Sequence, residues 1–117
     1  MISKYYEETA QNNFADMFDY AINDCEIEIN DFQDMFIKSE VAKRLDENDV
    51  LLLVGNSGIE WANMFIPKRK QTNPTYNKYK RSQEFWTGYA LAYFWLYSYY
   101  TLEEIVKEIS LENIRKM

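Results

Sequence analysis

The chain has 117 residues, a net charge of −6, and 47% hydrophobic and 17% aromatic residues. This composition excludes a disordered chain and predicts a single domain, residues 1–117, with one modest core. Histidine is absent and there is one cysteine, which removes the commonest general base and metal ligand and any thiolate zinc site. We therefore expect no enzyme, no metal and no cofactor.

The first segment carries apolar residues at helical spacing. One stripe runs from Tyr6 to Cys25 in three- and four-residue steps, which predicts an amphipathic helix with this stripe facing inward. Cys25 lies on the stripe, so we expect a small buried thiol. A single cysteine excludes an internal disulfide and fits a cytoplasmic location, and the polar start of the chain predicts no signal peptide.

Acidic residues dominate the same part of the chain. Residues 1–37, named here the acidic front, hold nine acids and one base, Lys4. Such an excess fits either a solvated helix face or a surface that binds a partner protein of opposite charge. Carboxylates can mimic phosphates, so a nucleic-acid-handling enzyme is one expected class of partner. The candidate contact residues are Asp16, Asp19, Asp24 and Glu28.

A second helix is predicted to start at Asp31, and polar residues at 46–49 are expected to end it. The residues expected on its inner face are Phe32, Met35, Phe36, Ser39 and Ala42. The apolar run that follows, VLLLV at 50–54, fits a short buried strand or a helical turn, since periodicity cannot separate the two at this length.

The stretch VLLLVGNSGIEWA (50–62) combines an apolar run, a glycine-containing turn and a short helix that Pro67 ends. A nucleophile elbow has this order of elements, but its glycine spacing is not met and no histidine is present to activate Ser57. No lysine follows the glycines, which excludes a P-loop. We interpret Ser57 as the N-cap of the short helix, with Glu60 at its positive end.

A basic loop follows at 67–81, with six bases and no acid. The bases alternate with Tyr76 and Tyr79, a pattern that suits phosphate contacts and base stacking, although a loop of this kind is often only solvated. The candidate nucleic-acid or partner contacts are Lys68, Arg69, Lys70, Lys78, Lys80 and Arg81.

An aromatic helix is predicted for residues 82–100, with Ser82 as its N-cap. Nine of the sixteen residues from Phe85 to Tyr100 are aromatic. A membrane span is disfavoured, because the run is short, its hydroxyls would lack partners and the mean hydropathy is −0.52. We expect a core helix, wrapped on nearly every side, on which Gly88 and Ala92 allow close approach of a neighbour; a cage for a cationic ligand remains an alternative.

The C-terminal part predicts two further helices. Thr101 and Glu104 form a capping-box pattern, and a last short helix is expected over 110–117. The predicted fold class is therefore all-α: a compact small helical bundle around the central aromatic helix, with a strand at 50–54 as the one open alternative.

Two motifs resemble a known family: GNSGIEWA at 55–62 and FWTGYALAYFWLYSYYTLEEI at 85–105. They are similar to the GKSGIELA and YWxGWALAYYQWY motifs of a family of small proteins of low-GC Gram-positive bacteria and their mobile elements. Some members continue into a helix-turn-helix domain, and this layout implies regulators or antitoxin-like proteins. Asn56 and Leu96 replace a lysine and a glutamine of the family pattern, and no DNA-binding domain is expected after Met117.

We expect a non-enzymatic protein-binding module, an antitoxin-like or phage-encoded inhibitor that occludes a partner protein. The alternative is a nucleic-acid-binding regulator that uses the basic loop, which the overall acidity disfavours. In neither case do we expect the protein to bind a membrane, and the sequence does not predict an oligomeric state.

Overall fold

The computed structural model describes residues 4–74 and 82–117, and every regular element in these ranges is helical. The all-α class is therefore confirmed. The three short 3₁₀ or π segments are η1 (Lys4–Tyr6), η2 (Tyr20–Asp24) and η3 (Lys68–Lys70). The eight α-helices are α1 (Glu7–Asp19), α2 (Ile29–Ile37), α3 (Glu40–Asp46), α4 (Val50–Gly55), α5 (Gly58–Phe65), α6 (Gln83–Leu96), α7 (Leu102–Glu108) and α8 (Leu111–Lys116).

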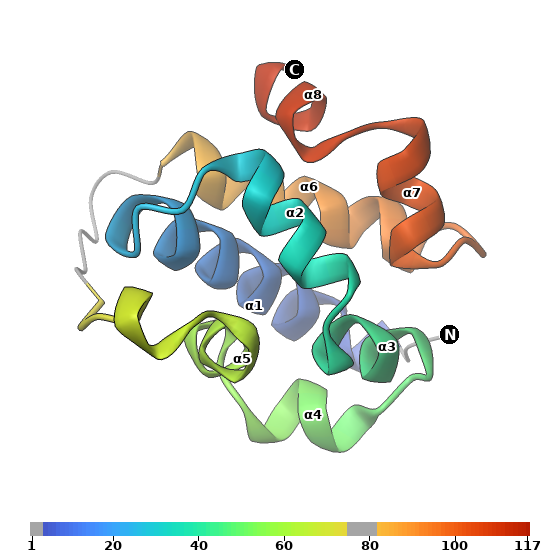
Figure 1. Ribbon diagram of the computed structural model, residues 1–117. Coiled ribbons are helices and arrows are strands. Elements are labelled where there is room, and N and C mark those ends of the chain that lie inside the picture. Colours follow the sequence, from blue (N-terminus) through green and yellow to red (C-terminus); the bar gives the residue numbers. More distant parts are fainter. Residues whose placement is uncertain (1–3, 75–81) are drawn as a thin grey trace.

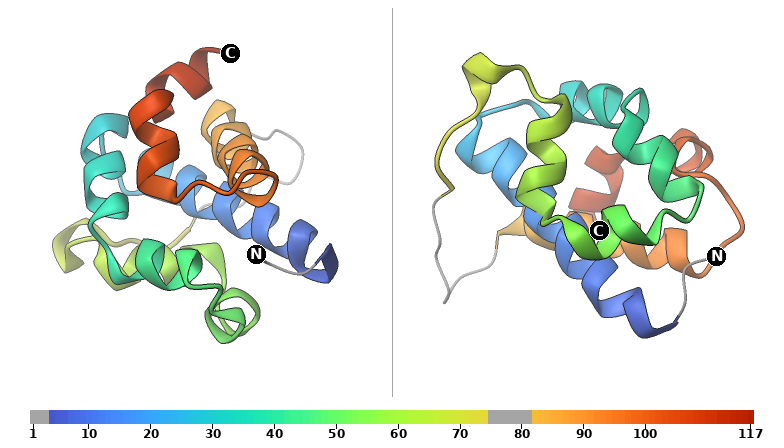
Figure 2. Two further views of the ribbon diagram at one scale, coloured as in Figure 1. Left: turned by 90° about the vertical axis from the view of Figure 1, so that its right-hand side faces the viewer. Right: turned by 90° about the horizontal axis from the view of Figure 1, so that it is seen from below.

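Helix α1 lies at the centre of the bundle, between α5 and α6 (Figures 1 and 2). It runs antiparallel to α6, since Ser82 bonds to Asp19 at one end and the Tyr97 hydroxyl donates to Glu7 Oε2 at the other (2.8 Å). Helices α2, α7 and α8 pack beside this pair, and α3 and α4 connect to α5. The radius of gyration, 12.9 Å, is that of a compact domain.

The core is built from aromatic rings of four helices. The ring of Phe14 on α1 is completely buried, and its centroid lies 6.2 Å from Phe36, 5.8 Å from Trp61 and 5.5 Å from Trp95. Two of these contacts are edge-to-face, the geometry that aromatic quadrupoles favour. Phe14 therefore joins α1 to α2, α5 and α6 at one point.

For residues 31–54 the structure corrects one expectation and decides between two open alternatives. The predicted second helix is broken in two, because Ser39 does not face the core but caps α3: its Oγ accepts from the Ala42 N–H (3.2 Å). Of the strand and the helical turn that were open for the run 50–54, the structure shows the helical one: this run lies in helix α4, whose N-cap Asp49 accepts from the Leu52 N–H (3.1 Å). In both places a short polar side chain satisfies free N–H groups at a helix start.

The aromatic helix differs from the expectation in its length and its exposure. Helix α6 ends at Leu96 and not at residue 100, and residues 97–101 form a linker to α7. One face of α6 is buried against α1, through Gly88 and Leu91 among others, but Trp86 and Tyr93 on the opposite face are exposed. Only one side of this helix is therefore core. None of the helices in the described ranges combines the length and the apolar character that crossing a membrane requires.

Candidate functional site

The turn at 55–58 has a structural role. Ser57 Oγ accepts from the Glu60 N–H (3.1 Å) and Glu60 Oε1 accepts from the Ser57 N–H (2.9 Å), which completes a capping box for α5. These hydrogen bonds hold the pKa of the Glu60 carboxyl below its ordinary value. The interpretation of Ser57 as an N-cap is confirmed, and the side chain once considered as a nucleophile is committed to the helix end.

The four candidate carboxylates of the acidic front come from three consecutive segments. Asp16 and Asp19 lie one turn apart on α1, Asp24 ends η2, and Glu28 is the N-cap of α2. Asp19 accepts from Ser82 and from Asn23 (2.8 Å), so it joins α1 to the start of α6. Asp19 thus helps to hold the fold together, and reversing its charge would lower stability as well as change the surface charge.

Glu28 fixes the start of α2. Its Oε2 accepts from the N–H groups of Asn30 (2.9 Å) and Asp31 (3.2 Å), where unpaired helix donors favour an anion. Of the four acids, Asp19 and Glu28 thus have structural roles that their hydrogen bonds define.

The basic loop is described only in its first part. Lys68, Arg69 and Lys70 form η3 and are exposed, whereas Lys78, Lys80 and Arg81 lie outside the described residues. Within the described ranges, none of the first three forms an ion pair. This turn is one compact patch of positive charge on an otherwise acidic protein.

The segment after η3 is tied to the core by a buried tyrosine. The Tyr20 hydroxyl lies 2.8 Å from Asn63 Oδ1 and 2.9 Å from the Thr72 carbonyl oxygen, and it accepts from the Thr72 N–H (3.2 Å). Gln71 Nε2 donates to the carbonyl oxygens of Asn63 (3.0 Å) and Ile66 (2.8 Å). These bonds hold both ends of the exposed basic turn.

Replacing Tyr20 with phenylalanine should release this segment. The Tyr20→Phe variant leaves Asn63 and Thr72 without their buried partner, so we expect a loss of about 1–3 kcal/mol in unfolding free energy and faster tryptic cleavage after residues 68–70. Limited proteolysis followed by mass spectrometry measures the cleavage. The control is Tyr93→Phe, an exposed tyrosine on α6. Equal cleavage rates in the two variants would show that Tyr20 does not anchor the segment.

An exposed row of aromatic side chains lies along α6 and its C-cap residue, and we name it the aromatic stripe: Trp86, Tyr93 and Tyr97. Their exposed fractions are 54%, 52% and 57%. Steps of seven and four residues place them on one helix face, and the rings of Tyr93 and Tyr97 are 4.7 Å apart. No charged residue occurs from Phe85 to Leu102, so this segment contributes none of the charges that usually solvate a helix. A charge beside the stripe comes from α1, where Glu7 accepts from the Tyr97 hydroxyl.

A recess adjoins one end of the stripe. It measures about 360 Å³ and lies between α6 and α8, with Trp86, Phe94 and Ile114 among its lining residues. Arg115 is at its edge, where its guanidinium lies 3.6 Å from the Glu84 carboxylate. The stripe therefore continues into an apolar hollow.

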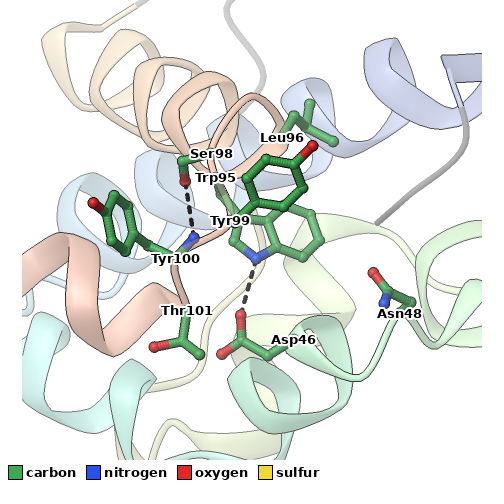
Figure 3. A pocket seen from close by; sticks show the side chains of 8 residues that line it. All are labelled: Asp46, Asn48, Trp95, Leu96, Ser98, Tyr99, Tyr100 and Thr101. Carbon is green, nitrogen blue, oxygen red and sulfur yellow. Dashed lines mark hydrogen bonds between the residues drawn. The ribbon is translucent and has the colours of Figure 1, made fainter.

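A second cavity, of about 230 Å³, opens at the other end of α6 (Figure 3). It lies where the ends of α3 and α6 meet the linker to α7. Its lining residues are Asp46, Asn48, Trp95, Leu96, Ser98, Tyr99, Tyr100 and Thr101. Carboxylate, amide and hydroxyl oxygens thus share a small cavity with three aromatic side chains.

Asp46 is the charged group of this cavity. Its Oδ1 accepts from Trp95 Nε1 (2.9 Å) and from the Leu102 N–H (3.2 Å), and Oδ2 lies 3.3 Å from the same N–H. Burial raises the pKa of the Asp46 carboxyl, although the hydrogen bonds from Trp95 and Leu102 oppose this effect. The carboxylate therefore connects α3, α6 and α7 while it is partly removed from water.

Sequence reasoning did not locate either the Asp46 cavity or the aromatic stripe. It assigned Asp46 only to a helix end, because the contact with Trp95 joins residues 49 positions apart and no local pattern announces it. It favoured the core for this helix and expected some of its tyrosines at the surface, but it could not say which, because rings occupy both faces of α6 and periodicity cannot separate them.

In the described part of the chain, no cluster of three or more acidic or cysteine side chains is arranged to hold a metal ion. No protein-family model, curated protein or solved structure matches this chain. The resemblance of its two motifs to a family of mobile-element proteins stays a prediction.

Proposed function

We propose that this protein is a non-enzymatic protein-binding module that acts by occluding a partner protein, and that the aromatic stripe is its main contact surface. The observation that carries the proposal is the outer face of α6, where large rings are exposed and the segment 85–102 contributes no charged side chain. Tyrosine and tryptophan dominate the energetics of protein interfaces, because each offers a large, stiff contact area with a polar tip.

The surroundings of the stripe support this role. The apolar recess of about 360 Å³ beside Trp86 offers a receptor for an apolar side chain of the partner. Tyr99 and Tyr100 extend the exposed aromatic surface into the linker after α6. A small, stable bundle that presents such a surface fits an inhibitor of the antitoxin-like or phage-encoded kind.

The acidic front serves as a second contact in this proposal. A net charge of −6 attracts a basic partner surface, including the groove of a nucleic-acid-handling enzyme, and raises the rate of encounter. Salt separates the two contributions: an interface dominated by aromatic contacts changes little in affinity as salt rises, whereas one dominated by carboxylates weakens steeply.

Alanine substitutions in the stripe provide the test. The double variant Trp86→Ala/Tyr93→Ala should weaken binding to a captured partner by about tenfold or more, because truncating an interface aromatic often costs 1–2 kcal/mol or more. The same variant should unfold within about 1 kcal/mol of wild type, since both side chains are exposed. Isothermal titration calorimetry with the partner, purified after affinity capture, measures the affinity and the stoichiometry.

The matched control is Met64→Ala/Val54→Ala, which removes exposed apolar side chains from α5 and α4. Equal weakening by the control and the stripe variant would reject the stripe as the contact surface. Turnover of a substrate by the isolated protein would reject the module itself. Dimerisation that the stripe variant abolishes would show that a second copy of this chain covers the stripe, which contradicts occlusion of another protein.

A second candidate function, nucleic-acid binding, is favoured by the exposed cations of η3. The triple variant Lys68→Ala/Arg69→Ala/Lys70→Ala separates the two functions. A nucleic-acid binder should lose affinity and show a smaller salt slope, by roughly one unit for each lost phosphate contact. A module that binds through the aromatic stripe should keep its affinity for the partner protein.

A further inference from the structure

The Asp46 carboxylate has no cationic partner among the residues that the structure describes. Within residues 4–74 and 82–117 it forms no ion pair, and the charged neighbour that acts on it is another acid, Glu104. Two neutral donors, Trp95 Nε1–H and the Leu102 N–H, satisfy part of its capacity. A carboxylate offers about four acceptor positions, so acceptor capacity remains.

We propose that the cavity beside Asp46 is a binding site for an organic cation of the size of a lysine or arginine side-chain head group. The cation is held by the carboxylate, and the rings of Trp95, Tyr99 and Tyr100 supply aromatic surfaces around it.

The chemistry of the lining selects a cation. An uncompensated, partly buried carboxylate repels anions and gains most from a positive charge, because a charge-assisted hydrogen bond in a partly dry site is about twice as strong as a neutral one. Aromatic faces attract the same cation through their negative π-surfaces. The side chain of Tyr99, 94% exposed at the cavity, makes few contacts of its own and can close over a bound group.

The size of the cavity limits the ligand. Its volume, about 230 Å³, lies below the range of roughly 300–1,000 Å³ typical of drug-sized ligands. An ammonium or guanidinium group with a short alkyl stem is of the right scale. The hydroxyl of Ser98 and the amide of Asn48, which also line the cavity, offer further acceptors to such donors.

The cation has two possible sources, a free amine or guanidine, or a side chain of a bound protein. In the second case the inference rests on the proposed function, and the cavity becomes the slot for one basic anchor of the partner. A test with small probes keeps the two proposals apart, since it requires no partner, while the stripe variants described above test the partner without the probes.

The indole N–H of Trp95 is the reporter for this test, because it donates to Asp46. We expect methylguanidinium or butylammonium, titrated at constant ionic strength, to shift the Trp95 indole resonance in ¹H–¹⁵N spectra saturably, with half-saturation in the millimolar range. Methylurea and 1-butanol are the neutral isosteres and should produce no saturable shift. The Trp61 indole, which donates to the Leu52 carbonyl oxygen (3.1 Å) elsewhere in the core, is an internal control.

Two variants test the roles of the lining residues. Asp46→Asn keeps an acceptor for Trp95 and removes the charge, so the cation affinity should fall at least about tenfold. Tyr99→Ala, at a side chain that the fold does not need, should weaken binding about two- to fivefold, the worth of an exposed cation–π contact. Tyr93→Ala, an exposed α6 tyrosine outside this cavity, is the matched control and should bind as wild type.

The comparison of the two cations shows whether an arginine-like or a lysine-like head group is preferred, and saturable binding of either supports the site. Three results would overturn it: no saturable shift of Trp95, an equal shift with the neutral isosteres, or unchanged affinity in both Asp46→Asn and Tyr99→Ala.

Discussion

Gly88→Ala should lower the free energy of unfolding by about 1–3 kcal/mol, even though alanine is the better helix former by roughly 1 kcal/mol. A Cβ at Gly88 would lie 2.4 Å from the Phe14 carbonyl oxygen and 2.7 Å from the Phe14 carbonyl carbon. These are backbone atoms of α1, so no rotamer change relieves the clash. Helices α1 and α6 would have to separate, and the ring contacts between them would loosen.

Gly58→Ala should have an effect of the same sign for the same reason. A Cβ there would lie 2.0 Å from the Asn13 carbonyl oxygen and 2.8 Å from the Met17 nitrogen, again on the backbone of α1. Gly55→Ala is the matched control, because beyond its chain neighbours and its own helix backbone no atom lies within 4 Å of the added carbon. Urea unfolding of the three variants provides the comparison, and a loss at Gly55 as large as at Gly88 would contradict the close-approach argument.

These glycines show what the sequence did and did not reveal. The close approach at Gly88 was predicted from its spacing with Ala92 on an aromatic helix, and the structure confirms it. Gly58 was assigned to a turn, where glycine normally supplies a positive φ. It is in fact the first residue of α5, and none of the described glycines has a positive φ. The absence of a side chain at Gly58 lets the backbone of α1 approach closely, and only the three-dimensional packing reveals this contact.

Local signals predicted local structure well. Ser57, Ser82 and Thr101 were identified as N-caps from the residues that follow them, and all three accept the expected N–H groups. Ser39 was missed, because apolar residues at helical spacing continue across it and favoured one long helix over two short ones. An N-cap that lies within a continuous apolar periodicity is therefore difficult to recognise from sequence.

The candidate sites depend on contacts that no local signal encodes. Asp46 meets Trp95 because the tertiary packing brings the end of α6 beside the end of α3. The partition of α6 into a buried and an exposed aromatic face is likewise decided by α1, whose backbone occupies the side that carries Gly88. The aromatic composition of α6 indicated either a contact surface or a core. The packing against α1 decides which rings are buried and which are exposed.

Phe14→Ala should produce the largest loss of stability, about 3–5 kcal/mol, the range for truncating a completely buried aromatic side chain. The ring touches Phe36, Trp61 and Trp95, so its removal opens a cavity where four helices meet. A domain of this size is stable by only about 5–15 kcal/mol, and the variant is therefore expected to unfold at a much lower urea concentration.

The same substitution also tests the connection between the core and the Asp46 cavity. The Phe14 ring stacks on Trp95 at 5.5 Å, and Trp95 donates to Asp46, so loss of the ring should broaden or shift the Trp95 indole resonance in the folded variant. Phe14→Leu fills most of the space and should cost clearly less than the alanine variant. Tyr93→Ala, with its exposed ring, should change stability by no more than about 0.5 kcal/mol. Surface substitutions change the unfolding free energy by roughly 0.5 kcal/mol. If the unfolding free energies of Phe14→Ala and Tyr93→Ala differ by less than about 1 kcal/mol, the shared aromatic core around α1 is not what holds the bundle together.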